Sequence, residues 1–439
     1  MSATARLDRR TLADLAERLK RARPETIRDV VALIDRLAVR GEADALIAPL
    51  RPRLALMRDL IRRPASFGRV LAHPFEELLV PPDAWRRGSL SVPRSVMPAA
   101  IAIATEALPE PARREIAARL AGASMDDAAA IQAVGAILWP AAAQRFAEIE
   151  RSGLPPSLAL PMRSAELRAL LGGLGEVLKL ASPLAALLSG TPRGTVHPWE
   201  QVERGLRAAA AEAAAISPEC FARTGLILVR RFMASGPVVS LLREAAGRSA
   251  GDGAERRLAE ALDCFLAELP SQMPDAETLA LLPHPVQQAM VSEAVALVER
   301  AGQDIGTWQA ERRDNLRAAE TRLFAVVRRR VADCLSAELL APLARLHAEG
   351  LAPGSGAGAI EALEAAARAA ASMAASVRRL GPADDLALAL RRAAETVAAL
   401  AVSAPQGAPA DRPGRTDLAR LVEILAGPDA AERVLGPPR

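Results

Sequence analysis

Residues 359–402 read AIEALEAAARAAASMAASVRRLGPADDLALALRRAAETVAALAV, and this stretch decides the fold class. It consists mostly of alanine, leucine, arginine and glutamate, which are the strongest helix formers. Gly381 and Pro382 interrupt the pattern, because glycine commonly ends a helix and proline cannot continue one. We therefore predict two Ala-rich helices, 359–380 and 383–402. Their small side chains would let the two axes approach closely in a tight hairpin.

The same bias runs through all 439 residues. Phe and Trp together make up 3% of the chain and Tyr is absent, so the aromatic residues that strands favour are scarce. Apolar residues recur at spacings of three and four, which places them on one face of a helix. The sequence predicts an all-α protein, either a multi-helix bundle or an irregular helical array. At least two thirds of its ordered residues should be helical, with no sheet of three or more strands.

One stretch suggests an unusually long element. No proline occurs between Pro285 and Pro342, and the pattern predicts one long helix over about 286–341. The alternative is a break near Gly302 and Gly306, because a single helix of about 55 residues exceeds the usual 8–20.

Proline, glycine and small polar residues divide the chain into segments. We expect a helical segment over 1–63, a Pro-rich connector over 64–98, a main helical body over 99–350, the Ala-rich hairpin over 359–402, a flexible linker over 403–415 and a short tethered helix over 416–435.

Charge gives little support for a nucleic-acid partner. The chain has 56 basic and 52 acidic residues, a surplus of four, whereas nucleic-acid binders usually carry a concentrated basic stripe. Lys20 and Lys179 are the only lysines. Because arginine and alanine have GC-rich codons, this skew indicates first a GC-rich bacterial genome.

Three widely spaced cysteines, Cys220, Cys264 and Cys334, suggest no disulfide framework. The charged amino terminus lacks the apolar core of a signal peptide, and no uncharged apolar run of 18 residues occurs. We expect a cytoplasmic protein with no membrane span.

Three of the four histidines share a local pattern: HPFEE at His73, HPWEQ at His197 and HPVQQ at His284. Proline followed by glutamate or glutamine is typical of a helix start. The alternative is a three-histidine metal site, but the separations follow no ligand spacing. We predict that the three are helix-start residues that do not converge, and we expect no bound metal or cofactor.

No motif for catalysis stands out. Phosphate-binding loops and GxSxG nucleophile turns are absent, and the pairs Asp126-Asp127 and Asp384-Asp385 fit the first turns of helices. The sequence leaves open whether the protein is an enzyme, and the lack of motifs favours a protein without catalytic chemistry of its own.

Arginines concentrate between 312 and 330. Arg313, Arg317 and Arg328 fall on one side of a helix and are candidates for contacting an anion or a nucleic acid. However, Arg322 and Arg329 fall on nearly the opposite side, with an apolar stripe between the two sets. This arrangement favours arginines that flank a packed seam.

The carboxyl-terminal segment carries a separate signal. Leu418, Leu421, Val422 and Leu425 form one apolar face after a plausible N-cap at Thr416. A helix of about ten residues is unstable alone in water, so this face needs a surface. It docks either on its own body or on a partner protein, for which these four residues would be the anchors.

The absence of a convergent polar constellation favours a helical protein-protein interaction, scaffold or adaptor protein, acting on another protein or through self-association. One alternative is an all-α enzyme or small-ligand-binding protein with a site between helices. A cleft lined by several arginines and an acid with a shifted pKa would favour that reading. A second alternative is a nucleic-acid-associated protein that uses the arginines of 312–330.

Overall fold

The computed structural model describes residues 64–82, 85–155, 162–191, 196–248, 252–305, 310–349, 356–403 and 413–435, together with single positions between 14 and 46. The predictions for segment 1–63 as a whole and for the linker 403–415 lie largely outside these residues. Five apolar positions of the amino-terminal segment are described as helical and buried: Leu19, Ile27, Val31, Ile34 and Leu46.

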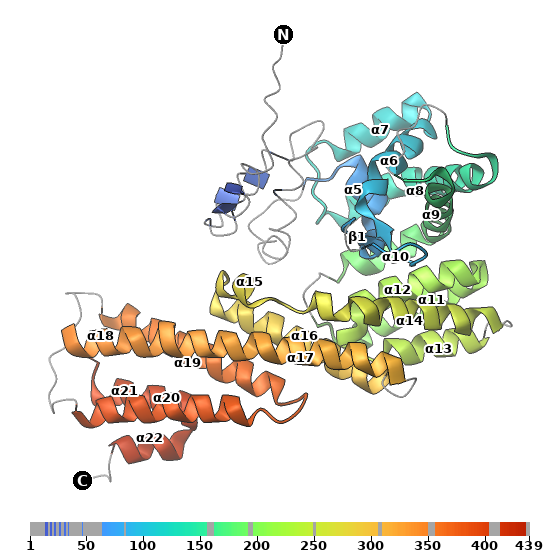
Figure 1. The fold of residues 1–439 in the computed structure, drawn as a ribbon. Coiled ribbons are helices and arrows are strands. Elements are labelled where there is room, and N and C mark those ends of the chain that lie inside the picture. Colours follow the sequence, from blue (N-terminus) through green and yellow to red (C-terminus); the bar gives the residue numbers. More distant parts are fainter. Residues whose placement is uncertain are drawn as a thin grey trace.

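The all-α prediction is confirmed, since helices account for 83% of the described residues. The one sheet within the described ranges has two short parallel strands, β1 (Leu79–Val80) and β2 (Val92–Pro93), with Leu79 opposite Val92. The helices fall into three successive groups along the chain (Figure 1).

The first group surrounds a long central helix, α8. Its elements are α5 (Phe67–Ala72), η4 (His73–Leu78), η5 (Arg94–Val96), α6 (Met97–Glu106), α7 (Glu110–Leu120), α8 (Ala128–Ser152), α9 (Ser164–Leu178) and α10 (Ala181–Ser189). Trp139 of α8 is fully buried, and its indole N–H donates to the carbonyl of Val70. Gly135 makes room for this ring, because a Cβ there would overlap it. The same helix begins at Asp127, whose carboxylate accepts the Ala130 N–H as predicted for a cap.

The segment 64–98, expected as a connector, is therefore part of the core. Val70, Leu71, Phe75 and Leu78 have no exposed surface. Its prolines mark helix starts and strand ends, as Pro74 does at the start of η4.

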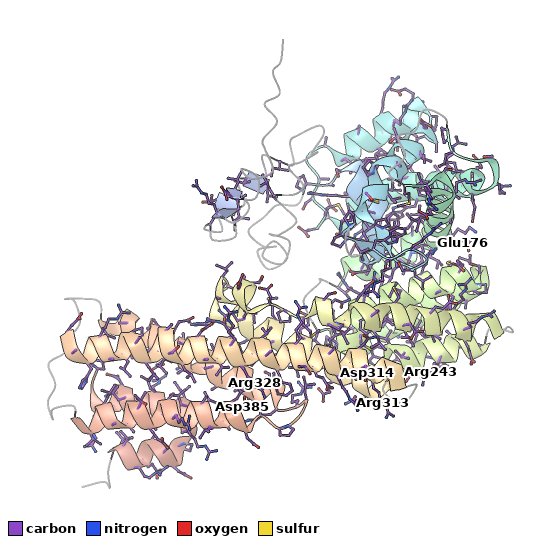
Figure 2. All side chains as sticks on the ribbon, viewed as in Figure 1. Glu176, Arg243, Arg313, Asp314, Arg328 and Asp385 are labelled. Atoms are coloured by element: carbon purple, nitrogen blue, oxygen red, sulfur yellow. The ribbon has the colours of Figure 1, made fainter. Side chains whose placement is uncertain are left out.

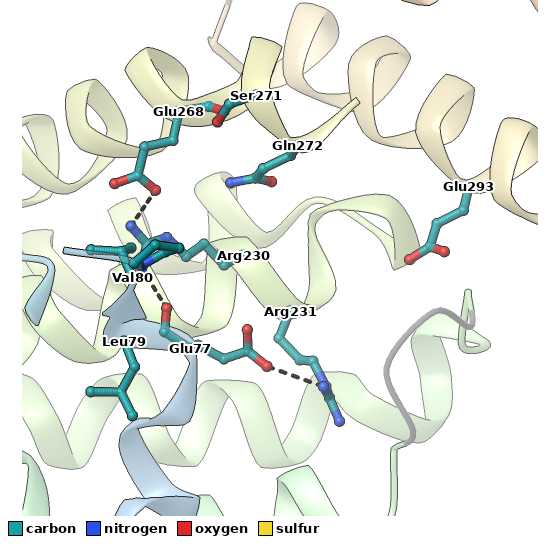
Figure 3. Close-up of a pocket in the computed structure, with 10 residues that line it drawn as sticks. Glu77, Leu79, Val80, Arg230, Arg231, Glu268, Ser271, Gln272 and Glu293 are labelled. Carbon is teal, nitrogen blue, oxygen red and sulfur yellow. Dashed lines mark hydrogen bonds and ion pairs between the residues drawn. The ribbon is translucent and has the colours of Figure 1, made fainter. Parts of the chain in front are cut away.

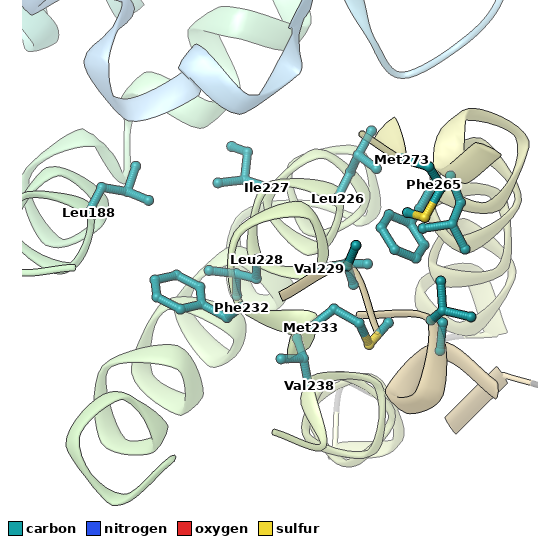
Figure 4. Packing of buried hydrophobic residues seen from close by; sticks show 14 of the residues in the cluster. Leu188, Leu226, Ile227, Leu228, Val229, Phe232, Met233, Val238, Phe265 and Met273 are labelled. Carbon is teal, nitrogen blue, oxygen red and sulfur yellow. The ribbon is translucent and has the colours of Figure 1, made fainter. Parts of the chain in front are cut away.

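The second group consists of α11 (Trp199–Ile216), α12 (Pro218–Phe232), η6 (Met233–Ser235), α13 (Val238–Arg248) and α14 (Asp252–Gln272). Helix α12 is its centre and is packed on several sides, by α9, α11, α14 and η4. Leu226, Val229 and Phe232 of α12 are wholly buried, and Phe265 of α14 lies in the same cluster (Figure 4).

The third group extends away from the second and ends at the carboxyl terminus (Figure 1). It contains α15 (Ala276–Ala280), α16 (His284–Ile305), α17 (Ala310–Asp333), the π-helix η7 (Cys334–Leu340), α18 (Ala341–Glu349), α19 (Gly356–Val377), α20 (Asp384–Ser403), α21 (Arg415–Ala426) and α22 (Pro428–Leu435).

The prediction of one helix over 286–341 is wrong, and the alternative break is what the structure has. Helix α16 ends at Ile305 and α17 begins at Ala310. The two run antiparallel, because Gly302 lies beside Leu316 near the break while Gln287 bonds to Arg330 farther from it. A continuous helical run does occur, but it spans 310–349 through η7 and α18. Packing of α16 on α17 buries the apolar faces of both, which a single extended helix would leave uncovered.

The two Ala-rich helices exist as predicted, as α19 and α20. Their small residues contact other helices more than they contact each other. Helix α19 packs closely on α16, α17 and η7, whereas α20 packs on α21. The alanines of α19 with almost no exposed surface are Ala366, Ala367, Ala369, Ala370 and Ala374.

The carboxyl-terminal face is covered by the protein itself. Leu418, Leu421, Val422 and Leu425 of α21 are all buried, on the side that α19 and α20 cover. The helix starts earlier than predicted, with Gly414 rather than Thr416 as its N-cap, because the Asp417 carboxylate reaches back to the Gly414 N–H at 2.9 Å. It ends at Gly427, which has a φ of +90° that other residues rarely adopt.

Among the described helices, none is by itself both long and apolar enough to cross a bilayer. Only α9 and α10 taken together, across a bend of 73°, reach that length and composition.

The buried face of α21 generates a stability prediction. We expect Leu421→Ala to lower the free energy of unfolding by about 3 kcal/mol, through lost apolar burial and the cavity left behind. Leu388→Ala on α20, where the side chain is 42% exposed, should cost less than about 0.5 kcal/mol. Urea unfolding followed by circular dichroism measures both, and equal effects would contradict the packing described.

Candidate functional site

The arginines of 312–330 do not form a single site. Arg317 lies 3.7 Å from Asp314, and Arg328 lies 2.5 Å from Asp385 and over the ring of Phe324 (Figure 2). Arg313, Arg322 and Arg329 are exposed. The predicted stripe between the two sets consists of Leu316, Ala319, Leu323 and Val327; the last three are buried and Leu316 is partly buried. The side chain of Arg312 lies outside the described residues. The exposed arginines thus flank a packed seam, and acidic neighbours offset two of them.

The histidines occupy helix starts, as predicted. His73 opens η4, His284 opens α16, and His197 lies two residues before α11. Their contacts differ: the His73 Nε2 lies 3.0 Å from Ser189 Oγ, whereas the His284 Nε2 lies 2.7 Å from Glu338 Oε2. The structure does not bring the three together.

A polar cleft lies where the three helix groups meet, and no motif pointed to it. Its volume is about 370 Å³, within the range of small-molecule sites. Arg230 and Arg231 enter it from the last turn of α12 (Figure 3). The remaining lining residues come from η4, β1 and the residue that follows it, α14 and α16: Glu77, Leu79, Val80, Pro81, Glu268, Ser271, Gln272 and Glu293.

Arg230 is almost fully buried and bonded on both of its terminal nitrogens. Its guanidinium donates to the Glu268 carboxylate, to the carbonyl of Glu77 and, at 2.6 Å, to Ser91 Oγ. Ser91 in turn donates to the second oxygen of Glu268 at 3.0 Å. The charge of Arg230 is therefore matched by Glu268 through a bonded triangle.

Arg231 forms a second buried pair with Glu77. Both side chains are only 10% exposed, and Nη1 lies 3.1 Å from the Glu77 Oε1. Its other terminal nitrogen donates to the carbonyls of Leu188 and Thr191, at the end of α10. Both arginines are thus committed to groups of the protein.

Glu293 differs from the other carboxylates of the cleft. It lies on α16 with its carboxylate pointing toward the cleft (Figure 3), and it makes no hydrogen bond or ion pair with any residue that the structure describes. Burial raises the pKa of Glu293 above its ordinary value, and the charge of Arg231 only partly opposes this. Among the residues that the structure describes, the cleft therefore presents one acceptor without a donor.

A second polar cluster surrounds η7. Arg330 is 2% exposed and bonds Gln287 at 2.7 Å and Glu338 at 2.6 Å. Cys334 is buried nearby, and burial raises the pKa of its thiol to about 12. His284 completes the cluster through Glu338.

Sequence reasoning missed both clusters, although each left a trace. Arg230-Arg231 follow the apolar run GLILV in a helix that is apolar on most sides, where a charged pair needs buried partners. Arg330, Cys334 and Glu338 recur at intervals of four, which places them on one helix face. Neither trace identifies the partners, because Glu77, Glu268 and His284 lie far away in the sequence.

No family model matches the chain, and no curated protein or solved structure is significantly similar to it.

The buried pair at Glu77 gives a second prediction. Glu77→Gln keeps the size of the side chain but leaves the Arg231 charge without its carboxylate, so we expect a loss of about 3 kcal/mol in stability. The matched control is Glu110→Gln, whose exposed pairs with Arg113 and Arg114 should contribute less than about 1 kcal/mol. Urea unfolding measures the free energy of unfolding of the two variants. A loss of stability in Glu110→Gln as large as in Glu77→Gln would contradict the role of burial.

Glu293 gives a third prediction, on pH. Its raised pKa means that the folded chain holds this proton more tightly than the unfolded chain. The folded state therefore loses stability as pH rises from the ordinary carboxyl value of 4.5 through the raised value, and the loss persists above it. Glu293→Gln should remove that loss and be more stable than the unmodified protein near neutral pH, with no such gain below about pH 4. Glu395→Gln, at an exposed position of α20, is the control, and a gain independent of pH would refute the assignment.

Proposed function

We propose that this chain is an all-α protein that binds a small organic cation in the cleft beside Arg230 and Arg231. The observation that carries the proposal is the carboxylate of Glu293, which points toward the cleft and has no partner among the described residues (Figure 3). An ammonium or guanidinium group would supply the missing donor and the missing positive charge.

The charges of the cleft favour a cation over an anion. Arg230 and Arg231 are balanced by Glu268 and Glu77, so an anionic ligand would have to displace a buried carboxylate from its arginine. Ionised Glu293 is the charge left over. A cation there needs to displace nothing.

The rest of the lining suits a ligand with an apolar part. Leu79, Val80 and Pro81 form one wall of the cleft, while Ser271 and Gln272 offer a hydroxyl and an amide. A primary amine on a short aliphatic chain fits this combination of one acid, a few polar groups and an apolar wall.

The scaffold reading favoured by the sequence rested on the lack of a convergent polar constellation. The cleft supplies such a constellation, and this supports the alternative of a small-ligand site between helices. A reducing, cytoplasmic setting is part of the proposal and is supported by three free thiols, Cys220, Cys264 and Cys334.

Three probes with one chain and different head groups test the proposal: hexylamine, 1-hexanol and hexanoate. We expect isothermal titration to detect hexylamine binding with a dissociation constant on the order of 1 mM, and no comparable binding of the other two. Glu293→Gln should weaken hexylamine binding about tenfold or more, since a charge-assisted bond contributes about 1.5–3 kcal/mol. Glu395→Gln should leave it unchanged.

The pH dependence provides an independent check. The charged groups around Glu293 are Arg230 and Arg231 from α12, Glu77 from η4 and Glu268 from α14. Because an alkyl ammonium stays charged below about pH 10, hexylamine affinity should rise with pH as Glu293 ionises. Hexanoate binding more tightly than hexylamine, or amine binding indifferent to Glu293→Gln, would contradict the proposal.

A further inference from the structure

The cluster at the π-helix η7 has a composition that the cleft does not share. A ring nitrogen of His284, Cys334 Sγ and a carboxylate oxygen of Glu338 all lie within 4.8 Å of one another. Within the described ranges this is the one group of three His, Cys, Asp or Glu donors that comes so close. The three atoms are of types that bind transition metals: an imidazole nitrogen, a sulfur and a carboxylate oxygen.

We propose that His284, Cys334 and Glu338 form a binding site for a divalent transition metal ion, and that the ligand set selects zinc. A nitrogen, sulfur and oxygen set suits zinc, whereas magnesium and calcium take oxygen ligands. The thiol of Cys334 makes no hydrogen bond with the residues that the structure describes, and it faces two polar ligands although it is buried. A buried cysteine used only as a small apolar residue would face apolar neighbours.

The surroundings hold the carboxylate in a suitable position. Arg330 Nη2 forms an ion pair with Glu338 Oε1 at 2.6 Å, so the other carboxylate oxygen, Oε2, faces His284. Arg330 is fixed in turn by Gln287, whose amide donates to the Leu282 carbonyl. Such outer contacts orient metal-binding carboxylates in known sites.

The imidazole of His284 and the carboxylate of Glu338 need only a small adjustment to take a metal. The His284 Nε2 and the Glu338 Oε2 now lie 2.7 Å apart, and tetrahedral coordination at about 2.0–2.2 Å would separate them by about 3.3 Å. Rotation of two partly exposed side chains supplies that change. Binding of Zn²⁺ would release the thiol proton of Cys334, and the resulting thiolate and the Glu338 carboxylate together would neutralise the ion. Because Glu338 also balances the charge of Arg330, the cluster as a whole would gain one positive charge.

The site has three protein ligands and one open side. Cys334 is buried, but the side chains of His284 and Glu338 are 21% and 35% exposed, which gives an ion a route from solvent. Three protein ligands with a free fourth position are the arrangement of catalytic zinc rather than of structural zinc. A π-helical turn such as η7 is also frequent at functional sites.

The proposed metal site is separate from the amine cleft. His284 and Glu293 both belong to α16 but are nine residues apart, which is two and a half turns at 3.6 residues per turn. Their side chains therefore leave α16 on opposite sides.

Cobalt(II) is the probe, because a thiolate ligand gives it a charge-transfer absorption that other ligands do not. The full chain, freed of metal with a chelator, is titrated with Co²⁺ and then competed with Zn²⁺. We expect one equivalent of Co²⁺ to bind with this absorption and Zn²⁺ to displace it.

Two variants should fail differently. Cys334→Ala should abolish the absorption, whereas His284→Asn should retain it but weaken Co²⁺ binding by about tenfold or more. Cys264→Ala, which removes a thiol of α14 outside the cluster, should change neither. Circular dichroism verifies that each variant is folded. If Cys334→Ala does not fold, Glu338→Gln at a partly exposed position takes its place, and it should weaken Co²⁺ binding by about tenfold or more, as expected for His284→Asn. The absence of the absorption in the unmodified protein, or its survival in folded Cys334→Ala, would overturn the proposal.

Discussion

Two arginine charges at the buried end of α12 are the constraint on which the rest of the structure depends. A guanidinium cannot lose its proton, so burying it without partners would cost several kcal/mol. Arg230 and Arg231 therefore have to be met by carboxylates and carbonyls brought from elsewhere in the chain. Those groups come from η4, the end of α10, Ser91 and α14.

The hydrogen bonds and ion pairs of Arg230 and Arg231 hold the first helix group against the second. Glu77 contributes its carboxylate to Arg231 and its carbonyl to Arg230, so η4 is held at the end of α12 by both residues. The short parallel pairing of β1 with β2 follows directly from that position, since β1 begins right after η4. The cleft is the space left beside this network, where Glu293 of α16 faces it without a bond of its own.

Local features of the fold were predictable because their causes are local. Helix starts at His73 and His284, the cap at Asp127 and the stop at Gly427 each depend on a few neighbouring residues. The break after Ile305 was only one of two options, because the choice depends on α16 finding α17 as a neighbour. The core position of 64–98 was missed because prolines that start helices and prolines in loops look alike in a sequence.

The two polar clusters could not be predicted for a related reason. Both depend on pairs that lie far apart in the sequence: 38 positions separate Arg230 from Glu268, 154 separate Arg231 from Glu77, and 54 separate His284 from Glu338. Periodicity reveals which face of a helix is apolar, but it does not say which helix will cover it. The sequence therefore shows that Arg230 and Arg231 are unusual, but it does not indicate which carboxylates form ion pairs with them.

Glu293, the one acid among the described residues of the cleft that is not paired with an arginine, is the residue proposed to recognise the ligand. A crystal structure of the protein soaked with hexylamine tests this most directly. It should show the ammonium nitrogen within about 3 Å of the Glu293 carboxylate, the aliphatic chain along Leu79 and Val80, and both arginine pairs unchanged. A cleft without the amine at saturating concentration, or an amine bound to Glu77 or Glu268 in place of an arginine, would contradict it.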